Sequence, residues 1–155
     1  MKMKIVLDEN AIMPERANPN DAGLDLISPI DVNLLAGCRE VIDTGVHIEI
    51  PKGYVGLITS KSGLMAQNGI LTSGTIDSGY TGSLRVVLFN LDDNDKILQI
   101  KRGRKIAQLV IFPIISPELE VVDKLDETAR GSGGFGSTGA FASKMEKPYI
   151  PWEAN

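Results

Sequence analysis

The sequence is built from short runs rich in valine, isoleucine and leucine, with glycine, proline, asparagine or aspartate between them. Runs of this length and spacing predict the strands of a sandwich or barrel. The last run is almost entirely apolar, which predicts a central strand. The runs are residues 39–51, 54–60, 83–91, 96–100 and 104–115.

Beyond these runs, only residues 62–69 show a helical pattern, which lasts about two turns and ends at Asn68-Gly69. The 16 glycines and 8 prolines favour many turns and leave little room for long helices. From about Asp123 the periodicity fades and small or polar residues dominate. We therefore expect one all-β domain over residues 1–122, followed by a mobile C-terminal arm over residues 123–155.

Composition and charge exclude several classes of function. The formal net charge of −4 argues against binding nucleic acid, which needs a basic face. The single cysteine, Cys38, cannot form an internal disulfide, and the single histidine, His47, cannot build a zinc site. No apolar stretch reaches the length of a membrane span, and the N-terminus lacks a signal-peptide pattern. We expect a cytoplasmic protein without direct membrane or nucleic-acid contact.

The segment "RGSGGFGSTG", residues 130–139, resembles two phosphate-binding loops without matching either. A dinucleotide fingerprint needs a strand before it and a helix after it, and a P-loop needs a lysine where Ser137 stands. What both loops share is a set of glycine N–H groups that converge on an anion, here helped by Arg130 and by hydroxyls. Phe135, set between glycines, would suit a lid that stacks on a flat ring. A disordered linker remains the alternative.

Two aspartates are candidate functional residues. Asp77 lies with Tyr80 in "GTIDSGYTG", residues 74–82, between two predicted strands, where an aspartate is often a structural turn residue. Asp25 lies in a strand-like run, where a carboxylate needs a metal, an arginine or water as its partner.

Three further polar residues interrupt apolar segments. Lys61 and Ser62 stand at a strand-to-helix junction, which favours anions, although Ser62 could simply be the helix N-cap. Gln108 is the lone amide in an apolar strand and could bond either a ligand or neighbouring backbone.

Taken together and in order, five stretches resemble the motifs of the trimeric dUTP pyrophosphatase (dUTPase) family. They are "AGLDL" at 22–26, "KSGL" at 61–64, "GTIDSGYTG" at 74–82, "RGRKIAQLVI" at 102–111 and "RGSGGFGSTG" at 130–139. The resemblance implies a jelly-roll-like β-barrel that forms a homotrimer with active sites shared between subunits. It implies hydrolysis of dUTP to dUMP and pyrophosphate, which limits uracil in DNA and supplies dUMP for thymidylate synthesis. The glycine-rich segment 130–139 becomes a lid over the nucleotide.

The resemblance also implies catalytic roles. Asp77 would be the general base for the water that attacks the α-phosphorus. Asp25 would support the metal hydration or the base from a second shell. Mg²⁺ would sit on the triphosphate without direct protein ligands. Mg²⁺, Arg130, Ser62 and Gln108 would share the charge of the leaving pyrophosphate.

The same resemblance assigns residues to the substrate. Tyr80 would pack on the deoxyribose and exclude a 2′-hydroxyl. Residues 69–76 would form a hairpin whose backbone pairs with uracil and rejects the methyl group of thymine. Phe135 would stack on the base. The remaining substrate-binding residues would be Lys61, Ser62, Gly63, Gly74, Ile76, Gly136, Ser137 and Thr138.

The chain departs from the family pattern at two positions, and two other functions stay open. Lys61 stands where arginine is usual, which replaces a bidentate contact by a point charge, and Ser83 stands where an acidic residue is common. A deoxycytidine triphosphate deaminase would need a glutamate at the position of Val87. A regulatory protein that uses nucleotide-dependent arm closure is the second alternative, and the sequence leaves the role of residues 140–155 open.

Overall fold

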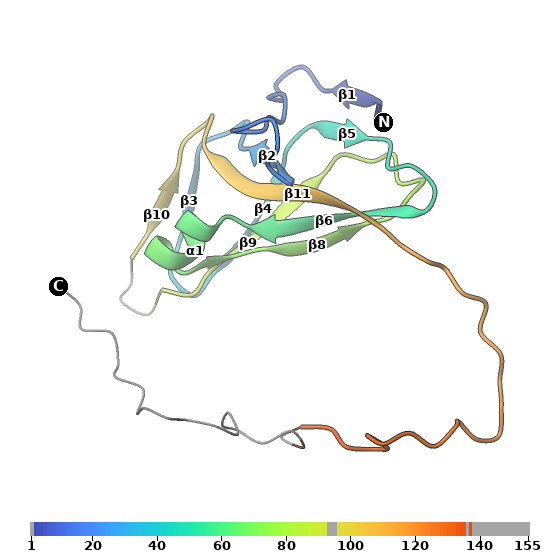
Figure 1. The fold of residues 1–155 in the computed structure, drawn as a ribbon. Coiled ribbons are helices and arrows are strands. Elements are labelled where there is room, and N and C mark those ends of the chain that lie inside the picture. Colours follow the sequence, from blue (N-terminus) through green and yellow to red (C-terminus); the bar gives the residue numbers. More distant parts are fainter. Residues whose placement is uncertain (1, 93–95, 136, 138–155) are drawn as a thin grey trace. The chain divides into compact units, whose positions relative to one another are not determined.

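The computed structural model describes residues 2–92, 96–135 and 137. The chain divides into two compact units, Met1–Pro117 and Glu118–Asn155. The first unit holds every helix and strand of the described residues, and they are almost all strands (Figure 1). In the second unit the described residues form no helix or strand and are almost all exposed. Among the described residues, no helix is both long and apolar enough to span a membrane.

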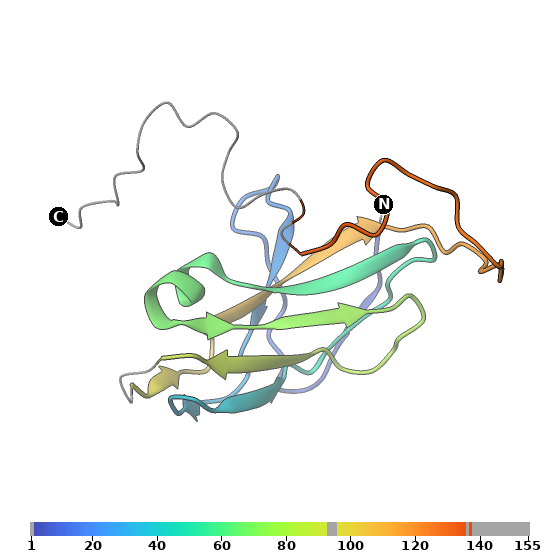
Figure 2. The same ribbon diagram turned by 90° about the horizontal axis from the view of Figure 1, so that it is seen from below.

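The largest sheet has four antiparallel strands in the order β2-β11-β6-β8. These strands are β2 (Gly23–Ile27), β11 (Lys105–Pro113), β6 (Tyr54–Ser60) and β8 (Ser73–Ile76). The nearly all-apolar strand β11 lies inside this sheet, as its sequence predicted, and pairs with β2 on one side and β6 on the other. Strand β8 is at the edge of the sheet, where it lies next to β9 of another sheet (Figure 2).

The remaining strands form three smaller antiparallel sheets. The three-stranded sheet has the order β4-β9-β7, and the two pairs are β1-β5 and β10-β3. Their bounds are β1 (Ile5–Leu7), β3 (Val32–Leu34), β4 (Arg39–Asp43), β5 (Val46–Ile48), β7 (Ile70–Leu71), β9 (Arg85–Asn90) and β10 (Leu98–Ile100).

One continuous apolar core lies between the sheets. Leu26, Ile58 and Leu109 come from the four-stranded sheet, and Ile42 and Leu88 come from β4 and β9; each is at most 2% exposed. Inward side chains alternate with exposed ones along β9 and β10, as expected of strands with one covered face. The all-β, jelly-roll-like fold with one short helix is confirmed for the described residues.

The helix α1 (Ser62–Asn68) covers the predicted segment and ends where predicted. Gly69 adopts the left-handed conformation, with a φ of 61°, and its N–H donates to the carbonyls of the last turn. The N-cap position belongs to Lys61, so the interpretation of Ser62 as the N-cap is wrong.

The expected hairpin over residues 69–76 is not formed. Strand β7 pairs with β9, whereas β8 pairs with β6, so the two halves of this segment belong to different sheets. The chain passes from one sheet to the other at Thr72. The hydroxyl of Ser60 stabilises this point, because it accepts a hydrogen bond from Thr72 N (2.8 Å) and donates one to Thr72 O (3.0 Å). The backbone of Thr72 is thereby bonded without a hairpin partner.

The predicted run 39–51 is likewise divided between two sheets. Strand β4 ends at Asp43 and β5 begins at Val46, and Gly45 between them has a φ of 66°. The carboxylate of Asp43 accepts a hydrogen bond from Gly45 N at 3.1 Å, which fixes this turn. The two strands then pair with β9 and β1, respectively.

Candidate active site

The carboxylate of Asp25 lies in β2 and is buried, with 6% of the residue exposed. The ammonium of Lys61 lies 2.5 Å from its Oδ1, and that of Lys105 lies 3.0 Å from its Oδ2. Lys105 also contacts Glu15 at 2.7 Å. The partners of Asp25 are therefore two lysines, whereas the sequence had suggested a metal, an arginine or water.

Burial alone would raise the pKa of Asp25, but the hydrogen bonds and charges of Lys61 and Lys105 outweigh it and lower that pKa below its ordinary value. The contacts with Glu15 and Asp25 raise the pKa of Lys105. Asp25 is thus a carboxylate at neutral pH and holds the ammonium of Lys61 in place. Lys105 had not been singled out, because a lysine at the start of an apolar strand gives no local sign of the group that it will face.

Gln108 lies directly opposite Asp25, because β11 pairs with β2 in this register. A Cβ atom on Gly23 would come within 2.7 Å of the Gln108 amide oxygen, so a larger residue there would push the amide out of this position. The amide has no hydrogen-bond partner among the residues that the structure describes. Gln108, Asp25 and Lys61 line a pocket of about 290 Å³, together with Ala17, Asp21, Ala22 and Gly23.

Ser62 and Gly63 follow Lys61 as the first two residues of α1, and both are exposed. A Cβ atom on Gly63 would meet nothing within 4 Å. The three residues of this motif therefore stand at the same end of β6, with Lys61 at the pocket and the other two open to solvent.

Asp77 directly follows β8 and begins the segment 77–83, here called the 77–83 turn. Its side chain is exposed and has no partner among the described residues, while its carbonyl accepts a hydrogen bond from Tyr80 N at 3.2 Å. The Tyr80 hydroxyl donates to Ser83 O at 3.0 Å. A side chain on Gly82 would overlap that hydroxyl, so a larger residue there would displace the Tyr80 ring.

Within the first unit, two groups of predicted site residues lie toward opposite ends of β6. Figure 1 shows that β6 leads into α1 at one end, whereas β8 runs out at the other. Ile76 lies opposite Gly56, so Asp77 lies near the first residues of β6, at the level of Val55, whereas Lys61 follows the last residue of that strand. With a rise of about 3.3 Å per residue, the backbones of Asp77 and Lys61 are roughly 20 Å apart. Within one chain the structure therefore gathers Asp25, Lys61 and Gln108 but leaves Asp77 and Tyr80 separate from them.

Gly74 and Ile76 lie on the edge strand β8. A Cβ atom on Gly74 would meet Ile58 at 3.6 Å, an ordinary contact, so packing within the chain does not require glycine there. A glycine on an edge strand leaves the backbone open to close approach by a ligand.

The described arm residues form tight turns. Arg130 Nε donates to Gly133 O at 3.1 Å, and Ser137 N donates to Gly134 O at 2.9 Å. The ring of Phe135 is fully exposed. Gly136, Thr138 and the tail 140–155 lie outside the described residues.

Comparisons with known proteins show to which family the chain belongs. The dUTPase family model matches residues 9–139. A deoxyuridine 5′-triphosphate nucleotidohydrolase of Rhodococcus erythropolis is 47% identical over 139 residues, which cover 88% of this chain and 84% of the relative.

Two solved structures share the fold. The dUTPase of Staphylococcus bacteriophage 80alpha with dUpNHpp superposes with a TM-score of 0.82 and 36% identity, covering 89% of this chain and 98% of that one. A mutant dUTPase from phage phi11 of S. aureus, solved with a structural Mg(II) ion, gives a TM-score of 0.74 and 35% identity, covering 82% and 100%. By fold, motifs and sequence, this chain belongs to the dUTPase family.

Proposed function

We propose that this protein hydrolyses dUTP to dUMP and pyrophosphate. The observation that carries the proposal is the exposed carboxylate of Asp77, presented beside Tyr80 on a hydrogen-bonded turn at the end of β8. The family match over residues 9–139 and a relative named deoxyuridine 5′-triphosphate nucleotidohydrolase support the choice of substrate.

Asp77 acts as the general base in this mechanism. Its carboxylate accepts a hydrogen bond from a water molecule and removes a proton as that water attacks the α-phosphorus. The P–O bond between the α-phosphorus and the bridging oxygen breaks, and pyrophosphate leaves with the bonding electrons. A free carboxylate on a fixed turn suits this role, because it is available to water and its backbone is held.

The pocket lined by Asp25, Lys61 and Gln108 binds the phosphates. These three residues are here called the phosphate-binding group. Lys61 supplies a positive charge, Gln108 and Ser62 supply neutral donors, and Arg130 from the arm adds a bidentate contact. Asp25 holds Lys61 through the 2.5 Å contact, so it is a positioning residue toward the phosphates. This assignment gives the buried carboxylate a definite task.

Mg²⁺ fits this site as an ion carried by the triphosphate. Among the described residues there is no cluster of three or more histidine, cysteine, aspartate or glutamate side chains, and Mg²⁺ commonly binds through phosphate oxygens and water. Each oxygen of Asp25 bonds one lysine and retains a lone pair that can accept a hydrogen bond from a water on the metal. The ion would neutralise charge on the phosphates.

Base and sugar recognition are proposed for β8 and the 77–83 turn. The backbone around Gly74 and Ile76 pairs with the uracil edge, where the missing side chain of Gly74 leaves room. The ring of Tyr80, tied through its hydroxyl to Ser83, packs on the deoxyribose and excludes a 2′-hydroxyl. Phe135 covers the base, and Ser137 contacts the phosphates, as do Gly136 and Thr138.

The active site is shared between copies of the chain. Asp77 and the phosphate-binding group are roughly 20 Å apart within one chain, which is too far for both to act on one scissile bond. A homotrimer in which the Asp77 end of one copy meets the Lys61 end of the next would complete three equivalent sites.

Deamination is disfavoured by Val87, which stands where the deaminase would carry its glutamate. Val87 lies in β9 opposite Val41 of β4, so two apolar side chains occupy this position of the sheet. The residues that the structure describes offer no observation that favours a purely regulatory role.

The test is steady-state pyrophosphate release with dUTP, dTTP, dCTP and UTP in the presence of Mg²⁺. We expect turnover of dUTP alone, and we expect Asp77→Asn to abolish turnover while dUTP binding stays within about tenfold. Ammonia release from dCTP, or a fully active Asp77→Asn variant, would contradict the assignment.

A further inference from the structure

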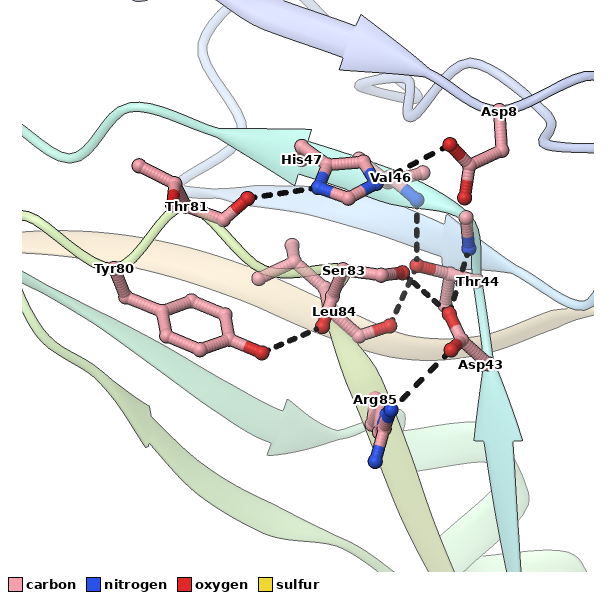
Figure 3. A network of polar contacts seen from close by, with 11 residues as sticks. Asp8, Asp43, Thr44, Val46, His47, Tyr80, Thr81, Ser83, Leu84 and Arg85 are labelled. Atoms are coloured by element: carbon pink, nitrogen blue, oxygen red, sulfur yellow. Dashed lines mark hydrogen bonds and ion pairs between the residues drawn. The ribbon is translucent and has the colours of Figure 1, made fainter.

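The single histidine of the chain links β5 to the 77–83 turn (Figure 3). His47 Nδ1 lies 2.8 Å from the carbonyl oxygen of Thr81, and its Nε2 lies 3.3 Å from Asp8 Oδ1. The imidazole is 28% exposed, so it is largely packed against these elements. One ring therefore connects the segment after β1, strand β5 and the turn that carries Asp77.

The other bonds that hold the turn act at its far end or within it. The hydroxyl of Ser83 donates to Asp43, and the hydroxyl of Thr44 donates to Leu84 O at 2.7 Å. The bond from Tyr80 to Ser83 lies inside the turn. In the described parts of the chain, His47 is the only side chain from outside the turn that bonds any of residues 77–82.

We propose that His47 is a positioning residue: its bond to Thr81 holds the 77–83 turn and thereby fixes how Asp77 and Tyr80 meet the nucleotide. The functional part of this inference rests on the proposed function, because it assigns Asp77 and Tyr80 to dUTP. The structural part, a histidine that anchors the turn, stands without it.

The chemistry of the contact fixes where the proton must lie. A carbonyl oxygen only accepts hydrogen bonds, so Nδ1 carries a proton in both the neutral and the charged ring. In the neutral ring Nε2 then turns a lone pair toward the Asp8 carboxylate, which is unfavourable. In the charged ring both nitrogens donate, so protonation strengthens the hold on the turn.

The charges around the ring favour its protonated form. The pKa of His47 is raised above its ordinary value, mainly by the hydrogen bond to the Thr81 carbonyl and then by the carboxylates of Asp8 and Asp43. Burial of the ring opposes this effect but is smaller than the effect of Thr81. The other charged groups nearby are paired: Lys4 lies 3.0 Å from Glu49, and Arg85 lies 3.5 Å from Asp43. Tyr80 completes the titratable groups that line the cavity beside His47.

Two substitutions in the full chain separate the bond from mere packing. His47→Asn keeps an amide donor near the Nδ1 position, whereas His47→Leu keeps apolar bulk and removes every donor. We expect His47→Leu to raise amide hydrogen exchange in residues 78–82 at least about tenfold and to lower kcat/KM for dUTP about tenfold. We expect His47→Asn to restore most of both.

The outcomes decide between a positioning role and a packing role. A His47→Leu variant with unchanged exchange in the turn would overturn the proposal, and so would a His47→Asn variant as impaired as His47→Leu. If the wild-type protein fails to hydrolyse dUTP, the proposed function fails, but the exchange measurement still decides whether His47 holds the turn.

Nitrogen NMR of the unmodified protein gives a second, activity-independent test, since His47 supplies the only imidazole signals. We expect the neutral ring to be the Nδ1–H tautomer and the pKa to fall in Asp8→Asn. A neutral ring found as the Nε2–H tautomer cannot donate to Thr81 and would overturn the proposal.

Discussion

At the scale of single residues, Asp25 shows how a buried carboxylate is satisfied by lysines where the motif resemblance led us to expect an arginine at position 61. The fork of an arginine could bond both carboxylate oxygens, whereas the ammonium of Lys61 bonds only Oδ1. Lys105 occupies Oδ2 instead. Two point charges thus satisfy a buried carboxylate that a single lysine would leave half bonded.

Asp25→Asn should destabilise the protein by about 1–3 kcal/mol at pH 7, because both lysines lose their charged partner. The folded pKa of Asp25 lies below its unfolded value of about 4. The carboxylate therefore contributes stability above that pH, and the contribution disappears as the pH falls through the folded pKa. The difference in melting temperature between wild type and Asp25→Asn should shrink as the pH falls below about 4.

The matched control is Glu127→Gln, which removes the exposed partner of Lys124. Because both side chains are solvated, this variant should melt like the wild type at every pH. An Asp25→Asn variant whose loss of stability is the same at pH 3 and pH 7 would show that the two ion pairs do not stabilise the fold.

At the scale of elements, two glycines differ in why a side chain is absent. Gly56 lies within β6, and Gly74 lies on β8 opposite that strand. A Cβ atom on Gly56 would lie 3.0 Å from Leu109 and 3.3 Å from Ile50 and Ile76. On Gly74 it would make only an ordinary contact with Ile58. Core packing therefore explains the first glycine, whereas packing within the chain does not require the second, which we assign to the proposed base site.

Gly56→Ala should lower the free energy of unfolding by about 1–3 kcal/mol through overpacking. Gly74→Ala should change it by less than about 1 kcal/mol but raise KM for dUTP at least about tenfold, because a methyl group would stand against the base. Urea unfolding and steady-state kinetics measure the two effects. A Gly74→Ala variant with normal KM would remove β8 from the base site.

The elements also show how far the sequence determines the fold. Local pattern predicted β6 over its full length, placed β11 inside a sheet and ended α1 at Gly69. It did not predict β1, β3 or β7, which are three residues long or shorter, nor the division of residues 69–76 between two sheets. Those pairings depend on distant partners such as Ser60, whose hydroxyl bonds the backbone of Thr72.

The candidate site was predictable only in part for the same reason. The motifs supplied Asp25, Lys61, Gln108, Asp77 and Tyr80, since each stands at a recognisable place in its stretch. The sequence could not supply the contact of Lys105 with Asp25, nor the bond from His47 to Thr81, which spans 34 positions. Such contacts form only when β11, β5 and the 77–83 turn have packed in the folded chain.

At the scale of the whole molecule, the arm should serve catalysis and not stability. The first unit, Met1–Pro117, contains all of the described strands and the continuous core. A chain that ends at Ala129 should keep its melting temperature within ~2 °C and lose turnover by about 100-fold or more, because Arg130 and Phe135 are gone. A large drop in melting temperature would make the arm structural.

The central claim is that Asp77 of one copy acts with the phosphate-binding group of another. The decisive measurement is the turnover of doubly tagged mixed oligomers assembled from two inactive variants, Asp77→Asn and Lys61→Ala/Gln108→Ala. In a cyclic trimer of either mixed composition, one site in three combines an intact Asp77 with an intact Lys61 and Gln108, so activity should return to about a third of wild type. Mixed oligomers as inactive as their parents would contradict the shared site.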